Sequence, residues 1–219
     1  MTLKMSVVTL KTDCKISMDA TKFRGFIASK FPEQILLHQH EGKGFVYLYP
    51  RVQYKVIDGM AMIVGIEEGV DVLQKIAPEI DCLNLGDERY EVIDKRIQEE
   101  NAKFGVNSVI RKYRFLTPWL ALNEKNYERY RLSNKKSQKE LLEKIMIGNL
   151  LSMAKGLEYV VTEEIKVILD VSPTNERVRL KKVEMAAFTG SFVTNFTIPD
   201  YFGLGKSISR GFGTILRTK

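Results

Sequence analysis

The chain has 219 residues, of which 44% are hydrophobic and 28% are charged. This length and composition exclude a mainly disordered protein and suit one large domain or two small ones. Lysine and arginine number 34 against 27 acidic residues, a net charge of +7, which favours a polyanionic partner such as nucleic acid. The positive charge is concentrated in the second half, and no acidic residue follows Asp200.

Other features of the sequence indicate the compartment. Cys14 and Cys82 have no motif spacing, which predicts buried thiols in a reducing environment. The first residues, MTLKMSVVTLK, have strand character rather than the apolar core of a signal peptide. The longest apolar run, residues 59–66, is too short to span a bilayer. We therefore expect a soluble, cytoplasmic protein with no membrane partner.

The first half of the chain is predicted to follow the order β-α-β-β-α-β. A helix at 19–30 has one apolar face, with Asp19 as its N-cap and Pro32 limiting its end. Asp58-Gly59 predicts a hairpin turn, because a type I′ turn needs positive φ. The other expected elements are strands at 3–10, 45–49, 52–56, 60–66, 82–85 and 89–93, a polar loop ending at 44, and a helix at 67–77.

The second half is predicted to read β-α-β-β, with no visible second helix. Its main helix is expected to start at the capping box Ser137-Gln-Lys-Glu140 and to end before Gly156 as the C′ residue. Strands are expected at 109–122, 165–171, from 177 onward, at 192–198 and at 214–216, with a turn at 173–175. The fold class predicted is α+β, two tandem ferredoxin-like (RRM-like, βαββαβ) domains at 1–108 and 109–219.

A glycine-rich loop stands near the C-terminus, Pro199-Asp-Tyr-Phe-Gly-Leu-Gly-Lys-Ser-Ile-Ser-Arg-Gly-Phe-Gly213. Its glycines let backbone amides face an anion, which predicts contacts with an RNA phosphate. The predicted RNA-binding residues are Gly203, Gly205, Lys206, Ser207, Ser209, Arg210, Gly211 and Gly213. A Walker A loop is excluded because Asp200 stands where the first glycine belongs. A Rossmann fingerprint is also excluded, because its glycines must open a βαβ unit and this loop does not. A purely structural turn remains the alternative.

This loop, just before a final strand, resembles the signature of the repeat-associated RNA-binding protein superfamily of CRISPR systems. Within that superfamily the chain resembles the CRISPR-repeat-processing endoribonucleases, and the run Tyr113-Arg-Phe-Leu-Thr-Pro-Trp-Leu-Ala-Leu-Asn123 is similar to the corresponding strand of that family. The resemblance implies crRNA processing in antiviral defense. It also implies CRISPR repeat RNA, precursor and processed, as the partner, and leaves open a homodimer and subunits of a CRISPR effector complex.

The only two histidines, His38 and His40, follow the first predicted helix, where the family commonly places a catalytic histidine. Imidazole can serve as base or acid near neutral pH, so metal-independent attack by the 2′-hydroxyl would leave a 2′,3′-cyclic phosphate and a 5′-hydroxyl. Residues two apart on an extended segment face the same side, and His40 is the stronger candidate if only one acts. Lys30 and Tyr47 are added as candidate catalytic residues from their closeness in sequence.

Three alternatives stay open. A closed zinc site needs three or four ligands, and beyond this pair the chain offers no further histidine and no C-x-x-C, so we expect no metal and no cofactor. An RRM-type aromatic platform could use Tyr47, Tyr49 and Tyr54. A non-catalytic RNA-binding subunit of a CRISPR ribonucleoprotein complex would keep the glycine loop but would not need histidines.

Overall fold

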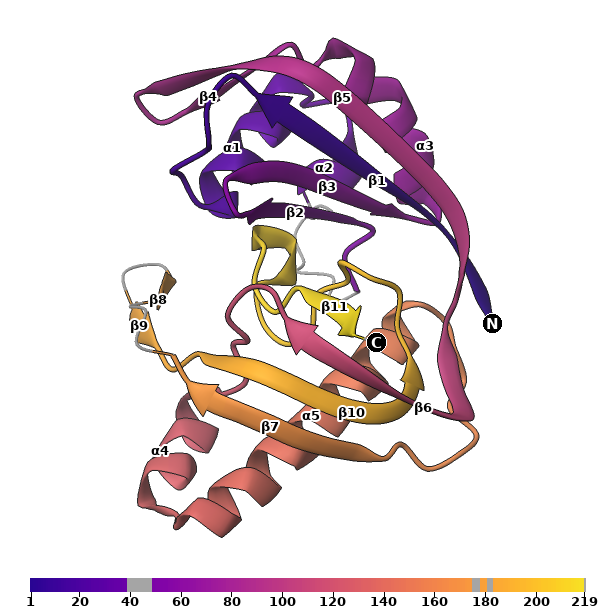
Figure 1. The fold of residues 1–219 in the computed structure, drawn as a ribbon, viewed down its shortest axis with the longest axis vertical. Coiled ribbons are helices and arrows are strands. Elements are labelled where there is room, and N and C mark those ends of the chain that lie inside the picture. The colour runs from indigo at the N-terminus through magenta and orange to yellow at the C-terminus, as the bar shows by residue number, and fades with distance from the viewer. Residues whose placement is uncertain (39–48, 175–177, 181–182, 219) are drawn as a thin grey trace. The chain divides into compact units, whose positions relative to one another are not determined.

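The computed structural model describes residues 1–38, 49–174, 178–180 and 183–218. The chain forms two compact units, which are coloured from indigo to magenta and from magenta to yellow in Figure 1. The first comprises Met1–Lys103 together with Ile208–Gly211, and the second comprises Phe104–Ser207 and Phe212–Lys219. A four-residue segment of the C-terminal loop therefore packs as part of the N-terminal unit.

The first unit has the predicted element order and a five-stranded antiparallel sheet of order β2-β3-β1-β5-β4. Its elements are β1 (Thr2–Thr12), α1 (Ala20–Lys30), α2 (Ile35–His38), β2 (Val52–Ile57), β3 (Met60–Ile66), α3 (Glu68–Ile76), η1 (Ala77–Glu79), β4 (Cys82–Leu85) and β5 (Glu88–Lys103). The central position of β1 between β3 and β5, with β2 at the edge, is the ferredoxin-like arrangement. Of the strand predicted at 45–49, residues 45–48 lie outside the described residues.

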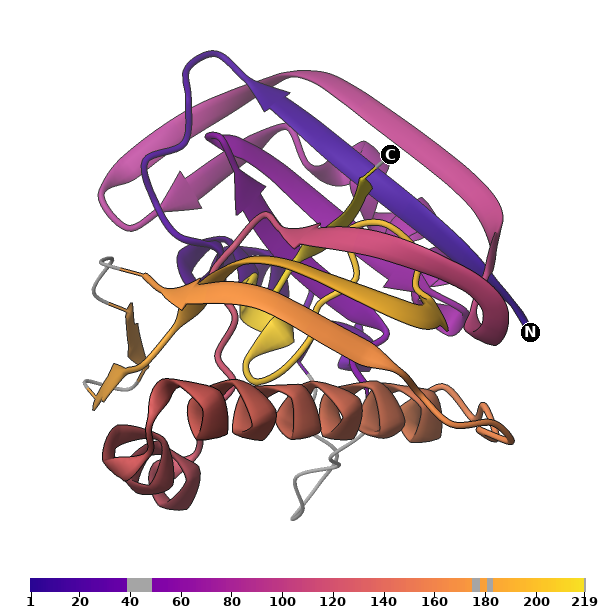
Figure 2. The same cartoon turned by 60° about the horizontal axis from the view of Figure 1, so that its bottom comes forward.

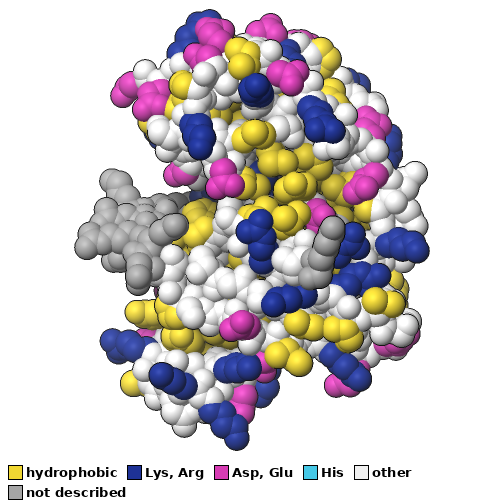
Figure 3. Space-filling model, viewed as in Figure 1, with side chains coloured by type: hydrophobic (Ala, Val, Ile, Leu, Met, Phe, Trp, Pro, Cys, Tyr) yellow, Lys and Arg dark blue, Asp and Glu magenta, His cyan; other side chains and the backbone are white. Residues whose placement is uncertain are grey.

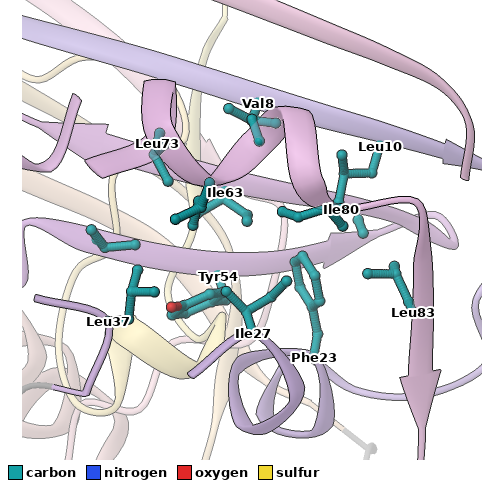
Figure 4. Close-up of a cluster of buried hydrophobic side chains, with 14 of the residues drawn as sticks. Val8, Leu10, Phe23, Ile27, Leu37, Tyr54, Ile63, Leu73, Ile80 and Leu83 are labelled. Carbon is teal, nitrogen blue, oxygen red and sulfur yellow. The ribbon is translucent and has the colours of Figure 1, made fainter. Parts of the chain in front are cut away.

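Helix α1 begins as the sequence predicts. The Asp19 carboxylate accepts hydrogen bonds from the backbone N–H groups of Thr21 (2.9 Å) and Lys22 (3.1 Å), so it satisfies two amides of the first turn. The apolar face of the helix places Phe23 and Ile27 in the core of the unit. Figure 4 shows both side chains packed with Tyr54 against the sheet. Burial of such a side chain contributes roughly 1.5–3 kcal/mol.

The hairpin between β2 and β3 also follows the prediction. Asp58 and Gly59 both have positive φ, at 53° and 83°. A Cβ on Gly59 would lie 2.8 Å from the Lys15 Cβ, so glycine is required there by packing as well as by its dihedral angle. The turn fixes the register of β2, and β2 carries several residues of the site described below.

The second unit contains a four-stranded antiparallel sheet of order β11-β6-β10-β7. Its elements are β6 (Gly105–Phe115), α4 (Glu124–Leu132), α5 (Lys135–Gly156), β7 (Val167–Pro173), β8 (Val178–Leu180), β9 (Val183–Met185), β10 (Phe188–Thr197) and β11 (Ile215–Thr218). Helix α5 runs along this sheet (Figure 2). Residues 198–214 are all described and contain only the 3₁₀ turn η2 (Ile208–Arg210), so the second helix of the ferredoxin-like pattern is missing, as the sequence indicates.

Several local predictions in the second unit are wrong. Helix α5 begins earlier than expected, because the Asn134 side chain, not Ser137, is the N-cap and accepts from the Ser137 N–H at 2.9 Å. Gly156 is the last helical residue rather than the C′ position. The long strand expected from residue 177 is divided into the β8–β9 hairpin and β10. Helix α4 was not predicted, because its residues show no apolar face and none of them is buried.

Two further features concern the whole chain. Cys14 is exposed and Cys82 is half-buried, and both are free thiols, so the expectation of two buried thiols is wrong. In the described part of the chain, no helix is long and apolar enough to cross a membrane.

Candidate active site

His38 is the last residue of α2 and lies against α1. Its backbone carbonyl accepts a hydrogen bond of 2.7 Å from the Arg24 Nη2. Its ring Nε2 is buried and has no hydrogen-bond partner among the described residues. A buried polar atom without a partner costs free energy, so an orphaned imidazole nitrogen indicates a site that is completed by a ligand. His40 and Tyr47 lie outside the described residues.

Two more unpartnered polar atoms belong to the neighbours of His38. The Tyr54 Oη on β2 and the Arg24 Nε on α1 are both buried without a hydrogen-bond partner in the described structure. The Tyr54 ring packs edge-on against Phe23, with centroids 5.6 Å apart, and Figure 4 shows its oxygen on the side of Leu37, the residue before His38. Both Tyr54 and Arg24 are hydrogen-bond donors, so this cluster would be satisfied by an acceptor.

The segment Ile208–Gly211 supplies another cation to the same unit. Gly211 has φ +89°, and a Cβ there would lie 2.6 Å from the Ala20 Cβ and 3.2 Å from the Tyr54 carbonyl oxygen. Only glycine therefore lets this segment approach α1 and β2 so closely. Ala20 lies one helical turn before Arg24, and the adjacent Arg210 is thereby placed beside the Arg24 guanidinium.

The electrostatics of this cluster favour an anion. Burial lowers the pKa of Arg24, and the positive charge of Arg210 lowers it further. Burial raises the pKa of Tyr54, and the charge of Arg24 opposes that shift. Among the described residues neither arginine forms an ion pair with a carboxylate, since the four ion pairs involve Lys4, Arg51, Arg89 and Lys95. Two neighbouring guanidinium groups without a carboxylate match the needs of a phosphate.

Lys55 is the most deeply buried cation of the first unit, with no exposed surface. Its Nζ donates to the Gln53 Oε1 at 3.0 Å and to the Ile208 carbonyl at 3.4 Å. Burial lowers the pKa of Lys55 to about 7. The ordinary pKa of about 10.4 applies in the unfolded chain. Between these two values the unfolded state binds more protons than the folded state, so the free energy of unfolding rises with pH in this window.

A Lys55→Met variant tests this linkage. Methionine removes the buried charge and keeps most of the volume, so the variant should gain most relative to wild type near pH 6, where Lys55 is charged in both states. The gain should shrink by about 1–3 kcal/mol between pH 6 and pH 9, since one linked proton changes stability by at most about 1.4 kcal/mol per pH unit. Urea unfolding of both proteins across this range measures the difference. A stability difference independent of pH would contradict the shifted pKa.

Lys30 stands at the end of α1, away from the contact that holds His38. Its Nζ donates to the Glu79 carbonyl of η1 at 2.5 Å and lies 5.6 Å from the centre of the Phe31 ring. Among the described residues it makes no hydrogen bond to His38. Arg24, which carries no functional signal in the sequence, makes a hydrogen bond to the His38 carbonyl instead.

Much of the glycine-rich loop is packed closely against the protein, and many of its backbone amides already have hydrogen-bond partners. A Cβ on Gly213 would lie 1.9 Å from the Leu204 carbonyl oxygen, and one on Gly205 would lie 2.7 Å from the Trp119 Nε1. Six of its amides already donate to backbone carbonyls, those of Tyr201, Phe202, Leu204, Lys206, Gly211 and Gly213. A phosphate at this loop would therefore depend on its side chains and on its other amides.

The remaining side chains of the loop differ in their surroundings. Lys206 is exposed and its Nζ donates to the Leu122 carbonyl at 3.0 Å; burial of its inner part lowers its pKa, against the charge of Glu124. Ser209 is buried, whereas Arg210 is half-buried. Arg210 is thus the loop cation that packs with the first unit, and its charge acts on Arg24.

Two alternatives can be compared with the structure. Tyr54 has no exposed surface and Tyr49 is 8% exposed, so neither offers a ring face to an RNA base, and the aromatic-platform interpretation is wrong for both. Among the described residues, no group of three or more His, Cys, Asp and Glu residues could hold a metal ion.

The basic residues of the middle of the chain form a separate surface on the second unit. Dark-blue side chains gather over α4 and the start of α5 (Figure 3). They are exposed residues of two short stretches: Lys125, Arg129, Arg131, Lys135, Lys136 and Lys139. Exposure to solvent on these helices is enough to explain why basic residues are concentrated in this part of the sequence, without any ligand. None of these residues belongs to the candidate site.

Comparison with known proteins gives consistent matches over the whole chain. The family model described as the Cas6b N-terminal domain matches residues 1–103, and the Cas6b C-terminal domain matches residues 105–218. A crystal structure of Cas6b is 34% identical, covers all of both chains and superposes with a TM-score of 0.94. A crystal structure of the CRISPR RNA processing endoribonuclease Cas6b is 32% identical over all of both chains, with a TM-score of 0.80.

A relative was also found by its amino-acid sequence. The protein named Uncharacterized protein MJ0978, from Methanocaldococcus jannaschii, is 42% identical over 137 residues, which are 63% of this chain and 92% of that protein.

Proposed function

The chain belongs to the Cas6b family, and we propose that it is an endoribonuclease that cuts CRISPR precursor RNA within its repeats. The full-length similarity to a CRISPR RNA processing endoribonuclease supports this proposal. The observation in this chain that carries it is the cluster around His38. Among the described residues, three of its buried polar atoms lack hydrogen-bond partners, and neither Arg24 nor Arg210 forms an ion pair. That arrangement is suited to a phosphodiester and to proton transfer at it.

The proposed reaction is transesterification without a metal ion. The 2′-oxygen attacks the adjacent phosphorus, and the bond from phosphorus to the 5′-oxygen of the next nucleotide breaks. A base takes the 2′ proton, and an acid protonates the departing 5′-oxygen, which leaves a 2′,3′-cyclic phosphate and a 5′-hydroxyl. His38 and His40 are the proposed acid and base, because an imidazole pKa near 6.5 permits either role near neutral pH.

The negative charge that develops on the phosphate requires donors. Arg24 and Arg210 supply two guanidinium groups, and charge stabilisation of this kind is often the largest contribution to catalysis. Tyr54 supplies a buried hydroxyl donor at the base of the cluster. Lys30 and Tyr47 remain proposed catalytic residues: Lys30 as positive charge at the end of α1, and Tyr47 as a hydrogen-bond donor.

RNA binding is proposed to extend from this cluster along the glycine-rich loop. Lys206 and Arg210 provide charge, Ser207 and Ser209 provide hydroxyl donors, and the glycines Gly203, Gly205, Gly211 and Gly213 permit close approach of the backbone. CRISPR repeat RNA, before and after cutting, is the proposed partner. A homodimer and subunits of an effector complex are further proposed partners.

The proposal is tested by incubating purified protein with end-labelled CRISPR repeat RNA in excess EDTA and resolving the products on a sequencing gel. We expect one cut, at the same rate as in magnesium. The downstream product should accept phosphate from polynucleotide kinase at its 5′-hydroxyl without prior dephosphorylation, and the upstream product should resist ligation at its 3′ end, because the 2′,3′-cyclic phosphate blocks that end. A rate that falls with EDTA and returns with added metal would contradict the metal-independent mechanism. RNA that is bound but intact would instead support the second candidate, a non-catalytic RNA-binding subunit.

A further inference from the structure

Lys55 and Gln53 form a buried polar relay on one face of β2. Both side chains have no exposed surface. The Gln53 Nε2 donates to the Pro50 carbonyl at 3.3 Å, and its Oε1 accepts from the Lys55 Nζ at 3.0 Å. The Lys55 Nζ also reaches the Ile208 carbonyl at 3.4 Å. The relay thus joins two points far apart in sequence, Pro50 and Ile208.

Burying this relay costs free energy of desolvation. A buried ammonium loses its hydration, and among the described residues Lys55 has no carboxylate to offset that loss. Replacing buried ionic groups by apolar side chains of similar size is often neutral or stabilising. We therefore expect that Lys55 does not stabilise the fold, and we look for another role at its position.

Both ends of the relay adjoin the proposed site. Ile208 precedes Arg210 by two residues, and Gly211 packs on Ala20 and the Tyr54 backbone. Pro50 is the second described residue after the segment that carries His40 and Tyr47. Alternation along β2 places Tyr54 on the opposite face, in the core with Phe23. One strand thus presents Tyr54 to the His38 cluster and the relay to the glycine loop.

We propose that Gln53 and Lys55 are positioning residues for RNA cleavage, which hold the Ile208–Gly211 segment on β2 so that Arg210 is presented beside Arg24 and His38. This inference rests on the proposed function for the identity of the ligand. The contacts themselves are independent of it, because they concern only how the loop is held.

The test combines Lys55→Met with a matched control, Lys75→Met, which makes the same substitution at an exposed lysine of α3 in the same unit. We expect Lys55→Met to bind repeat RNA roughly three- to tenfold more weakly, the effect of losing about one ordinary hydrogen bond, because Arg210 is misplaced rather than removed. Its unfolding free energy at pH 7 should equal or exceed that of wild type. Peptides covering 206–213 should exchange their amide hydrogens faster than in wild type, and Lys75→Met should change none of these quantities.

Loss of function without loss of stability is the signature of a positioning role, because a merely structural lysine would lower both together. The proposal would be overturned if the Lys55→Met protein had the RNA affinity of wild type and the same amide-hydrogen protection at 206–213. So would an equal fall in stability and binding.

A second pair of variants keeps the test valid if Lys55→Met does not fold. Gln53→Glu loses the Nε2 bond to Pro50 but retains an acceptor for the Lys55 Nζ, so it should keep the amide protection of 206–213, whereas Gln53→Leu removes the acceptor and should expose this segment as Lys55→Met does. Equal behaviour of the two Gln53 variants would overturn the relay. Hydrogen exchange needs no RNA, so failure of the proposed nuclease function is distinguishable from failure of this inference.

Discussion

Replacing His40 by alanine is expected to slow single-turnover cleavage of repeat RNA by about 10²–10⁴, the usual contribution of a general acid or base. The affinity for RNA should change by less than about threefold, because the interaction is used in the transition state rather than in binding. His38→Ala should slow the reaction as well, since the buried Nε2 of His38 has no hydrogen-bond partner among the described residues and is free to serve the substrate. Rates at saturating protein and filter-binding constants measure the two quantities separately.

The matched control for the histidines is Glu33→Ala, at an exposed position in the connection between α1 and α2. Its rate should stay within about twofold of wild type, as expected for a surface substitution away from reacting groups. A His40→Ala enzyme that cuts at the wild-type rate would remove His40 from the mechanism. If His38→Ala alone lost activity, the acid and base roles would have to be divided between His38 and another residue.

Gly211→Ala is expected to weaken RNA binding by roughly 10–100-fold, equivalent to the loss of about one hydrogen bond to a charged group. The added Cβ would meet the Ala20 Cβ at 2.6 Å, at a backbone φ of +89° that alanine rarely adopts. The segment must move off α1, and Arg210 moves with it. Filter binding gives the affinity, and urea unfolding gives the accompanying loss of stability.

Gly25→Ala is the matched control in α1. Nothing lies within 4 Å of a Cβ at that position, and alanine favours the helix by roughly 0.5–1 kcal/mol, so this variant should be slightly more stable and bind RNA normally. Wild-type affinity in Gly211→Ala would show that close packing of the loop on α1 is not needed for binding RNA.

The parts of the fold that were predictable are those fixed by local signals. Asp19 caps α1 as its position before the apolar periodicity predicts, and Asp58-Gly59 makes the expected turn. Helix α4 was missed because Asn123 is its only strong signal, with no apolar stripe behind it. The start of α5 was misplaced because two polar residues, Asn134 and Ser137, compete as N-caps, and sequence alone does not rank them.

The composition of the site was less accessible than the fold. Alternation in β2 predicts one buried face, yet Gln53 and Lys55 on the other face are buried too. Their cover is the Ile208–Gly211 segment, and the contact from Lys55 to Ile208 spans 153 residues of sequence. Arg24 similarly reads as an ordinary surface position on α1 until α2 and the loop are placed around it. Single-sequence patterns carry no information on such long-range contacts.

The most direct test of the central claim is cleavage of a repeat RNA with one 2′-deoxynucleotide immediately 5′ of the mapped cut. The account predicts that this RNA binds with normal affinity and is not cut at that position, because the attacking 2′-hydroxyl is absent. The same substitution one nucleotide 3′ of the cut should leave the rate nearly unchanged. Cleavage of the first substrate at the wild-type rate would contradict attack by the 2′-hydroxyl, and with it the proposed roles of His38 and His40.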